Sequence, residues 1–178
     1  MTQLQPGDRA PSRVLVDTGH TPWRIPHTGL LHLQFRRFAG CPVCNLHLAS
    51  FAQRAPDIEA AGVQELVVFS STAGAMVAHR DSLPFPIVAD PDRALRQAFG
   101  AGSSAAAMMS PAAMWQATRG MLHVKGMPMP EQVSATMLLP ADLLIAPGGT
   151  VVDALYGRTA GQAWTVDELL ERAAAAGS

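Results

Sequence analysis

Apolar residues occur along the chain in short runs, which alternate between strand-like and helix-like spacing and are separated by turn residues. Residues 14–16 and 23–25 predict two short strands that pair with each other. Residues 30–35 form a nearly continuous apolar run, which predicts a central strand buried on both faces. Apolar positions at helical spacing after Cys41 predict a helix that Pro56 ends or kinks.

The second half of the chain continues this alternation. The first expected elements are a strand over 63–69, a short helix to about residue 81 and an extended segment at 84–88. Asp90, Pro91 and Asp92 then open a helix over 93–99. A hairpin of 143–146 and 151–155 and a closing helix over 164–176 follow. This order predicts an α/β fold with a mixed central sheet flanked by helices. The length of 178 residues suits a single domain over 1–178.

Residues 101–130 differ from the rest because they contain no acidic residue and six of the nine methionines. They predict a Met-rich helical insertion, broken by Pro111 and Gly120. Packing is the favoured role of these methionines, because flexible side chains fill irregular gaps. Two alternatives remain, a substrate groove and Cu(I) ligation by Met127 and Met129.

The charge balance and the hydropathy of the chain indicate which partners and which compartment to expect. The 13 basic and 14 acidic residues give a formal net charge of -1, so no charge excess indicates binding to nucleic acid or to anionic lipid. The first residues lack the basic and apolar regions of a secretory signal, and no apolar run is long enough to cross a membrane. We therefore expect a reducing, cytoplasmic location.

The two cysteines, Cys41 and Cys44, lie three positions apart at the start of the helix predicted after Cys41. Pro42 suits the first helical position, which makes Cys41 the expected cap residue. Free N–H groups and the helix dipole then lower the pKa of Cys41 and favour it as the nucleophile. Cys44 is near enough to form a disulfide with it. A redox dithiol is the favoured interpretation, and a metal site or two inert core cysteines are the alternatives.

Zinc would need two ligands besides the cysteines, and only His47 lies close to them in sequence. We therefore expect no metal and no cofactor. An exposed or capped helix histidine is the simpler interpretation of His47. Arg36 and Arg37 end the strand that leads to Cys41, and strand alternation would direct one of them towards the thiolate and the other towards solvent. Arg119 is a further candidate anion partner.

Three segments carry a resemblance to a known family: residues 5–11, residues 38–44 with the Cys-Pro-Val-Cys turn, and residues 83–93. They resemble the opening, active-site turn and middle strand of peroxiredoxin-like proteins of the AhpC/TSA group, in the thioredoxin superfamily. The resemblance implies a thioredoxin-like fold. Gln34 and Phe38 stand where typical peroxiredoxins carry proline and threonine, which is a departure from the peroxidase pattern.

Residues 139–152 resemble the thioredoxin segment in which a cis-proline faces the dithiol, so Pro140 is the expected cis-proline and substrate-binding residue. A trans-proline at a strand entrance is the alternative. The resemblance implies a thiol-dependent oxidoreductase in which Cys41 attacks a peroxide or disulfide and Cys44 resolves the product. The expected partners are a thiol reductant, either a small thiol or a thioredoxin-type protein, and the peroxide or disulfide substrate. A homodimer is left open, as are a disulfide reductase and a non-catalytic binding protein.

Overall fold

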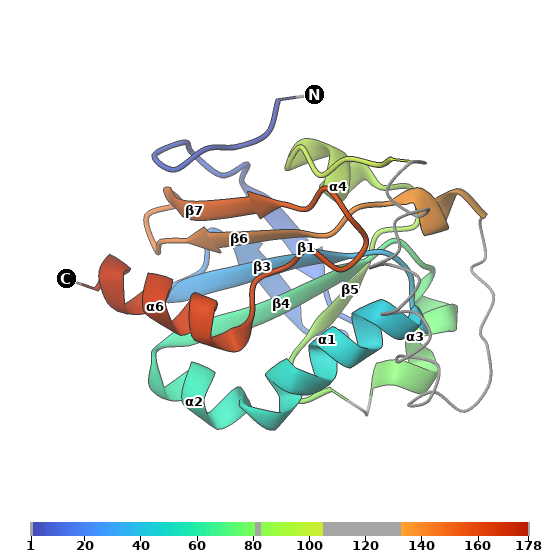
Figure 1. The fold of residues 1–178 in the computed structure, drawn as a ribbon, viewed down its shortest axis with the longest axis horizontal. Helices are drawn as coiled ribbons and strands as arrows, with labels where there is room; N and C mark the ends of the chain where they lie inside the picture. Colours follow the sequence, from blue (N-terminus) through green and yellow to red (C-terminus); the bar gives the residue numbers. More distant parts are fainter. Residues whose placement is uncertain (1, 81–82, 105–132, 178) are drawn as a thin grey trace.

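A computed structural model describes residues 2–80, 83–104 and 133–177 and builds them around a five-stranded mixed sheet of order β5-β4-β3-β6-β7 (Figure 1). Its strands are β3 (Leu30–Arg36), β4 (Val63–Phe69), β5 (Ile87–Ala89), β6 (Ala141–Ile145) and β7 (Val151–Tyr156). β3, β4 and β5 run parallel, whereas β6 pairs antiparallel with both β3 and β7. A separate antiparallel hairpin consists of β1 (Arg13–Val16) and β2 (Pro22–Ile25).

Helices and the hairpin cover the two faces of the sheet. The helical elements are α1 (Pro42–Gln53), α2 (Ala55–Ala60), α3 (Ala73–Arg80), α4 (Ala94–Ala98), the 3-10 helix η2 (Val133–Met137) and α6 (Val166–Ala176). In Figure 1, α1, α2 and α6 lie in front of the sheet and the β1–β2 hairpin lies behind it. Two apolar cores result: one holds buried residues of α1, α2, α3 and α6, and the other holds residues of the hairpin and α4.

The structure confirms the predicted order of strands and helices and the thioredoxin-like α/β fold with its mixed central sheet. The Met-rich insertion lies almost entirely outside the described residues, and so does Arg119. The single domain over 1–178 stays a prediction. Within the described ranges, no helix has the length and apolar character needed to span a membrane.

Local sequence signals account for the helix starts. Pro42 occupies the first turn of α1, and Pro56 does so in α2, where its missing N–H breaks no helical hydrogen bond. Thr165 and Glu168 form a reciprocal capping box at the start of α6. The start of α4 differs from the prediction, because the Asp90 carboxylate reaches forward to accept from the N–H groups of Leu95 and Arg96.

β3 is buried on both faces although every second side chain in its centre is polar. Leu31, Leu33 and Phe35 belong to the core behind the sheet, and the alternate residues His32, Gln34 and Arg36 face α1 and α6. Strict alternation of apolar and polar residues is typical of a strand with one face in water. All six side chains are nevertheless buried, as predicted for a central strand, so the polar three require partners inside the protein.

Candidate active site

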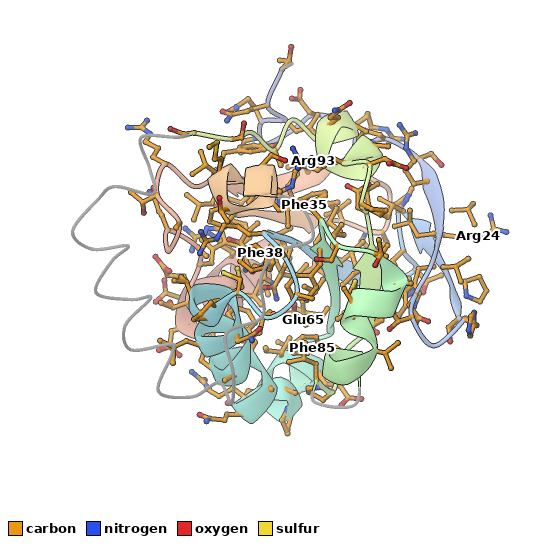
Figure 2. The ribbon with its side chains drawn as sticks, turned by 90° about the vertical axis from the view of Figure 1, so that its right-hand side faces the viewer. Arg24, Phe35, Phe38, Glu65, Phe85 and Arg93 are labelled. Atoms are coloured by element: carbon orange, nitrogen blue, oxygen red, sulfur yellow. The ribbon has the colours of Figure 1, made fainter. Side chains whose placement is uncertain are left out.

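A tight turn after β3 places the two cysteines at the start of α1. Gly40 has φ 78, a left-handed conformation that glycine adopts without strain, and the N–H of Cys41 donates to the Phe38 carbonyl at 3.2 Å. The buried Ser71 hydroxyl accepts from the Ala39 N–H at 3.0 Å. In Figure 2, Phe38 lies beside this end of α1. Backbone hydrogen bonds therefore fix the turn that carries the dithiol.

Cys41 caps α1, as the sequence predicts, and both cysteines are free thiols. The Cys41 sulfur accepts from the Cys44 backbone N–H at 3.4 Å. Cys41 is fully buried, and Cys44 is 3 % exposed. This arrangement gives one N-terminal N–H of the helix to the sulfur of Cys41 and brings the second thiol into the same turn.

Arg37 is the cation beside the dithiol. Its Nη2 donates to the Cys41 sulfur at 2.9 Å, and its Nη1 donates to the Thr136 carbonyl in η2 at 3.2 Å. The buried Nε of Arg37 has no acceptor among the described residues. Arg36 points to the other side, towards Asp142, so strand alternation separates the two arginines as predicted. The expectation that the second arginine faces solvent is wrong, because Arg36 is buried and pairs with Asp142.

The two thiols titrate as a pair. A hydrogen bond from Cys41 lowers the pKa of Cys44 to about 5 against the effect of burial, and the charge of Arg37 adds to this lowering. Burial and the hydrogen bond with Cys44 raise the pKa of Cys41 well above its usual range. Burial therefore opposes the lowering of the Cys41 pKa that the sequence leads us to expect, and the hydrogen bond between the two sulfurs links both shifts. One proton leaves the pair readily, and the other is held between the sulfurs.

Pro140 lies beside the dithiol, but the predicted cis peptide bond before it is wrong. The Leu139–Pro140 bond is trans, and the cis bond among the described residues is Ile25–Pro26. The Leu139 N–H donates to the Gly102 carbonyl at 3.1 Å, and its own carbonyl accepts from Arg96 Nη1 at 2.6 Å. These contacts hold an extended chain before the proline and occupy the backbone edge that was expected to pair with a substrate.

Arg96 is a buried residue that the sequence did not single out. From α4 its guanidinium donates to the carbonyl of Arg36 at 2.8 Å and to that of Leu139, and its Nε donates to Ser70 Oγ at 3.3 Å. Burial lowers its pKa to about 10, so it remains charged at neutral pH. Arg96 therefore joins the ends of β3 and β6 at the positions just before Arg37 and Pro140.

A buried polar network runs from the middle of the sheet to His47 on α1. Arg36 Nη2 donates to Asp142 Oδ1 at 2.6 Å, and His32 lies between Glu65 at 2.9 Å and Asp142 at 3.3 Å. Gln34 links Glu65 to Arg36. The network was not predicted, because its members come from three strands. In Figure 2, Glu65 lies inside the molecule, whereas Arg24 extends at its edge.

Two cations and two anions in this network balance each other. Burial disfavours a charged His32, but the charge and hydrogen bond of Glu65 and the nearby charge of Asp142 outweigh it and raise the pKa of His32 to about 9. Asp142 is buried too, yet Arg36 and His32 hold its pKa well below the usual range. Two basic side chains, His32 and Arg36, therefore face the two carboxyl groups of Glu65 and Asp142.

His47 connects the network to the surface near Cys44. Its Nε2 lies 2.8 Å from Arg36 Nη2, and a guanidinium can only donate, so the histidine proton sits on Nδ1. Burial and the charge of Arg36 lower the pKa of His47 to about 3. Both the exposed and the metal-binding interpretations of His47 lose support. No cluster of three metal-binding side chains occurs in the described part of the chain.

A nuclear magnetic resonance titration is expected to show His32 protonated until about pH 9 and His47 neutral down to about pH 3. Because the folded pKa of His32 exceeds the unfolded value of about 6.5, its contribution to stability is complete below pH 6.5 and is lost as the pH rises through 9. The imidazole carbon-bound proton shifts of both residues measure this directly. A midpoint near 6.5 for His32 would contradict the network.

A cavity of about 200 Å³ opens next to Cys44. Its lining residues are Arg36, Val43, Cys44, Leu46, His47, Pro140, Ala160, Gly161 and Ala163. Cys41 does not line it. Pro140 and Cys44 therefore line the same cavity without a cis bond, and the substrate-binding role of Pro140 stays a prediction.

The sequence profile of the AhpC/TSA family matches residues 6–154, which is most of the chain. The chain belongs to the AhpC/TSA family. This membership makes it a thiol peroxidase or thiol-disulfide oxidoreductase, in agreement with the predicted class of enzyme. No curated protein matches the sequence.

Solved structures of peroxiredoxins share the fold. Peroxidoxin BcpB of Mycobacterium tuberculosis has a TM-score of 0.70 at 16% identity, with 97% of this chain and 98% of that chain covered. Peroxiredoxin 6 of Arenicola marina has a TM-score of 0.73 at 15% identity, with 98% and 74% covered. A candidate thiol:disulfide interchange protein, DsbE, of Chlorobium tepidum has a TM-score of 0.58 at 20% identity, with 98% of both chains covered.

Proposed function

We propose that this AhpC/TSA protein reduces hydroperoxides with the dithiol of Cys41 and Cys44, and that Cys41 is the attacking sulfur. The observation that carries the proposal is the 2.9 Å contact between Arg37 Nη2 and the Cys41 sulfur. A guanidinium at this distance stabilises a thiolate on Cys41. Arg37 Nε, buried and without an acceptor among the described residues, is a donor that a peroxide oxygen can satisfy.

The first step uses the proton that the two sulfurs share. One proton leaves the pair, and the remaining proton, held in the hydrogen bond between the sulfurs, passes to Cys44, which gives a Cys41 thiolate next to Arg37. That thiolate attacks the terminal peroxide oxygen and the O–O bond breaks. The oxygen stays on sulfur as the sulfenic acid, and the departing alkoxide takes the proton from Cys44 and leaves as an alcohol, or as water when the substrate is hydrogen peroxide.

The second step closes the disulfide. The Cys44 thiolate attacks the Cys41 sulfenic acid, an S–S bond forms, and hydroxide leaves and is protonated to water. Cys44 is in the first turn of the helix that Cys41 caps, so little movement separates the two sulfurs. Overall, one hydroperoxide and two thiols give one disulfide, one alcohol and one water. A thiol reductant must then restore the dithiol.

Hydroperoxide is the favoured substrate over a protein disulfide because of the segment before Pro140. An extended peptide substrate pairs with free backbone groups at a cis-proline, and here both groups of Leu139 are used within the chain. The reducing, cytoplasmic location expected from the sequence suits a peroxidase that a small thiol recycles. We therefore propose that the protein works in the cytoplasm.

Mixing the reduced protein with hydrogen peroxide is expected to form the Cys41–Cys44 disulfide faster, at equal concentrations, than mixing it with a disulfide-bonded peptide. Rapid-quench alkylation followed by peptide mapping measures both rates. A faster reaction with the peptide would favour the disulfide reductase. Two thiols that react with neither oxidant would favour the non-catalytic binding protein.

Arg37→Met supplies the matched variant for this comparison. Removing a charge-assisted hydrogen bond to the thiolate is expected to lower the peroxide rate about 10- to 100-fold, from a loss of about 1.5–3 kcal/mol. Arg158→Met, at an exposed arginine remote in sequence from the dithiol, is the control. Equal rates in Arg37→Met and the unmodified protein would remove the main support for Cys41 as the attacking sulfur.

A further inference from the structure

The cavity beside Cys44 is the described hollow that reaches the dithiol, and the two peroxide steps do not use it. At about 200 Å³ it is much larger than a peroxide group, which needs roughly 60 Å³ if it occupies the volume of two waters. It contacts Cys44 but not Cys41. Its size and position therefore point to a second reactant that acts on Cys44.

The lining of the cavity selects an uncharged ligand. Six of its residues are apolar or small: Val43, Leu46, Pro140, Ala160, Gly161 and Ala163. The polar part consists of Arg36, whose charge Asp142 balances at 2.6 Å, and His47, which stays neutral above a pKa of about 3. An ionic group placed here would be desolvated without gaining an unpaired counter-ion.

The same geometry decides which sulfur of the disulfide is open to attack. A reductant thiolate must reach one sulfur and expel the other, and access and leaving-group stability together determine the choice. Access favours attack on Cys44, because that residue lines the cavity. A Cys41 thiolate that leaves has two donors in place, because its sulfur accepts from Arg37 Nη2 at 2.9 Å and from the Cys44 N–H at 3.4 Å.

We infer that the cavity binds a low-molecular-weight thiol with an uncharged, partly apolar body, and that this thiol reduces the disulfide by attacking Cys44. Its thiolate forms an S–S bond with Cys44, the Cys41–Cys44 bond breaks, and Cys41 leaves with the electron pair as a thiolate. A second thiolate then attacks the sulfur of the bound thiol, which releases a small disulfide and the Cys44 thiolate. The inference rests on the proposed dithiol cycle.

The direct test traps the mixed disulfide on the unmodified protein. The oxidised protein is mixed with mercaptoethanol, quenched in acid, alkylated, and fragmented by mass spectrometry to locate the adduct. We expect mercaptoethanol on Cys44 and the alkyl group on Cys41. An adduct on Cys41 would overturn the inference. If peroxide forms no disulfide at all, the proposed function itself has failed, and the two failures are therefore distinguishable.

A variant and a set of probes test the cavity. Ala163→Leu fills it and is expected to slow reduction by mercaptoethanol about tenfold, because the attacking sulfur is displaced, while oxidation by peroxide changes less than about twofold. Ala175→Leu, on the exposed side of α6, should change neither rate. At equal thiolate concentration, neutral mercaptoethanol should react faster than anionic mercaptoacetate or cationic cysteamine. Faster reduction by a charged probe or by a thioredoxin-type protein, unaffected by Ala163→Leu, would overturn the inference.

Discussion

Cys41→Ser is expected to lower peroxide consumption at least about a thousandfold, because a serine hydroxyl is not ionised at neutral pH and cannot replace the attacking thiolate. Cys44→Ser should behave differently. It keeps the Arg37 contact with the Cys41 sulfur and should consume one peroxide per protein before stopping at the sulfenic acid. Peroxide disappearance in single- and multiple-turnover conditions measures both variants, and a sulfenic acid probe identifies the stalled product.

The opposite result for the two cysteine variants would identify a different attacking residue. Cys44 has a lowered pKa and also lines the cavity, so Cys44 is the competing nucleophile. Full single-turnover oxidation in Cys41→Ser, together with none in Cys44→Ser, would assign the attack to Cys44. Loss of activity in both variants, with sulfenic acid in neither, would contradict the dithiol mechanism. Circular dichroism of each variant controls for folding.

Asp142→Asn is expected to lower the free energy of unfolding by about 3–5 kcal/mol at pH 7, the usual cost of removing one partner from a buried ion pair. Asparagine keeps the shape but not the charge. Arg36 and protonated His32 would then share Glu65 as their remaining counter-ion in the described network. Urea denaturation followed by tryptophan fluorescence measures the change.

Asp153→Asn is the matched control for Asp142→Asn. Asp153 also pairs with an arginine, Arg172, at 2.7 Å, but both side chains are about one-third exposed to water. Such a pair contributes at most about 1 kcal/mol. If the two variants lose equal stability, the charges of the buried network are not what stabilises it.

The cysteine turn was predictable because its signals are local. Two cysteines three positions apart, with Pro42 between them, specify a helix start, and strand alternation separates Arg36 from Arg37. The order of strands was predictable for the same reason, since each strand is a short apolar run between turn residues.

The buried network was not predictable, because it depends on which strands become neighbours. Gln34 lies opposite Asp142 in the antiparallel pair of β3 and β6, and His32 lies opposite Glu65 in the parallel pair of β3 and β4. These partners are far apart in sequence. The apolar run over residues 30–35 correctly predicted that β3 is buried. It did not show that one face of β3 carries polar side chains, whose partners come from the neighbouring strands.

The error at Pro140 has a similar origin. The motif before the hairpin suggested a cis bond, but the backbone of Leu139 is held by Gly102 and by Arg96 from the opposite face of the sheet. The sequence also did not show the complete burial of Cys41, which raises the pKa of its thiol. Helix-terminus arguments assume a partly solvated cap, and this cap has no contact with water.

The charge balance of the buried network constrains how this sequence can change over evolutionary time. Exchanging His32, Asp142 or Arg36 for an apolar residue one at a time passes through a protein with an unpaired buried charge, which selection removes. Once the whole set has been replaced by apolar residues, no buried charge is left without a partner. Descendants of this chain should therefore retain the set together or lose it together, and mixed combinations should be rare among functional sequences.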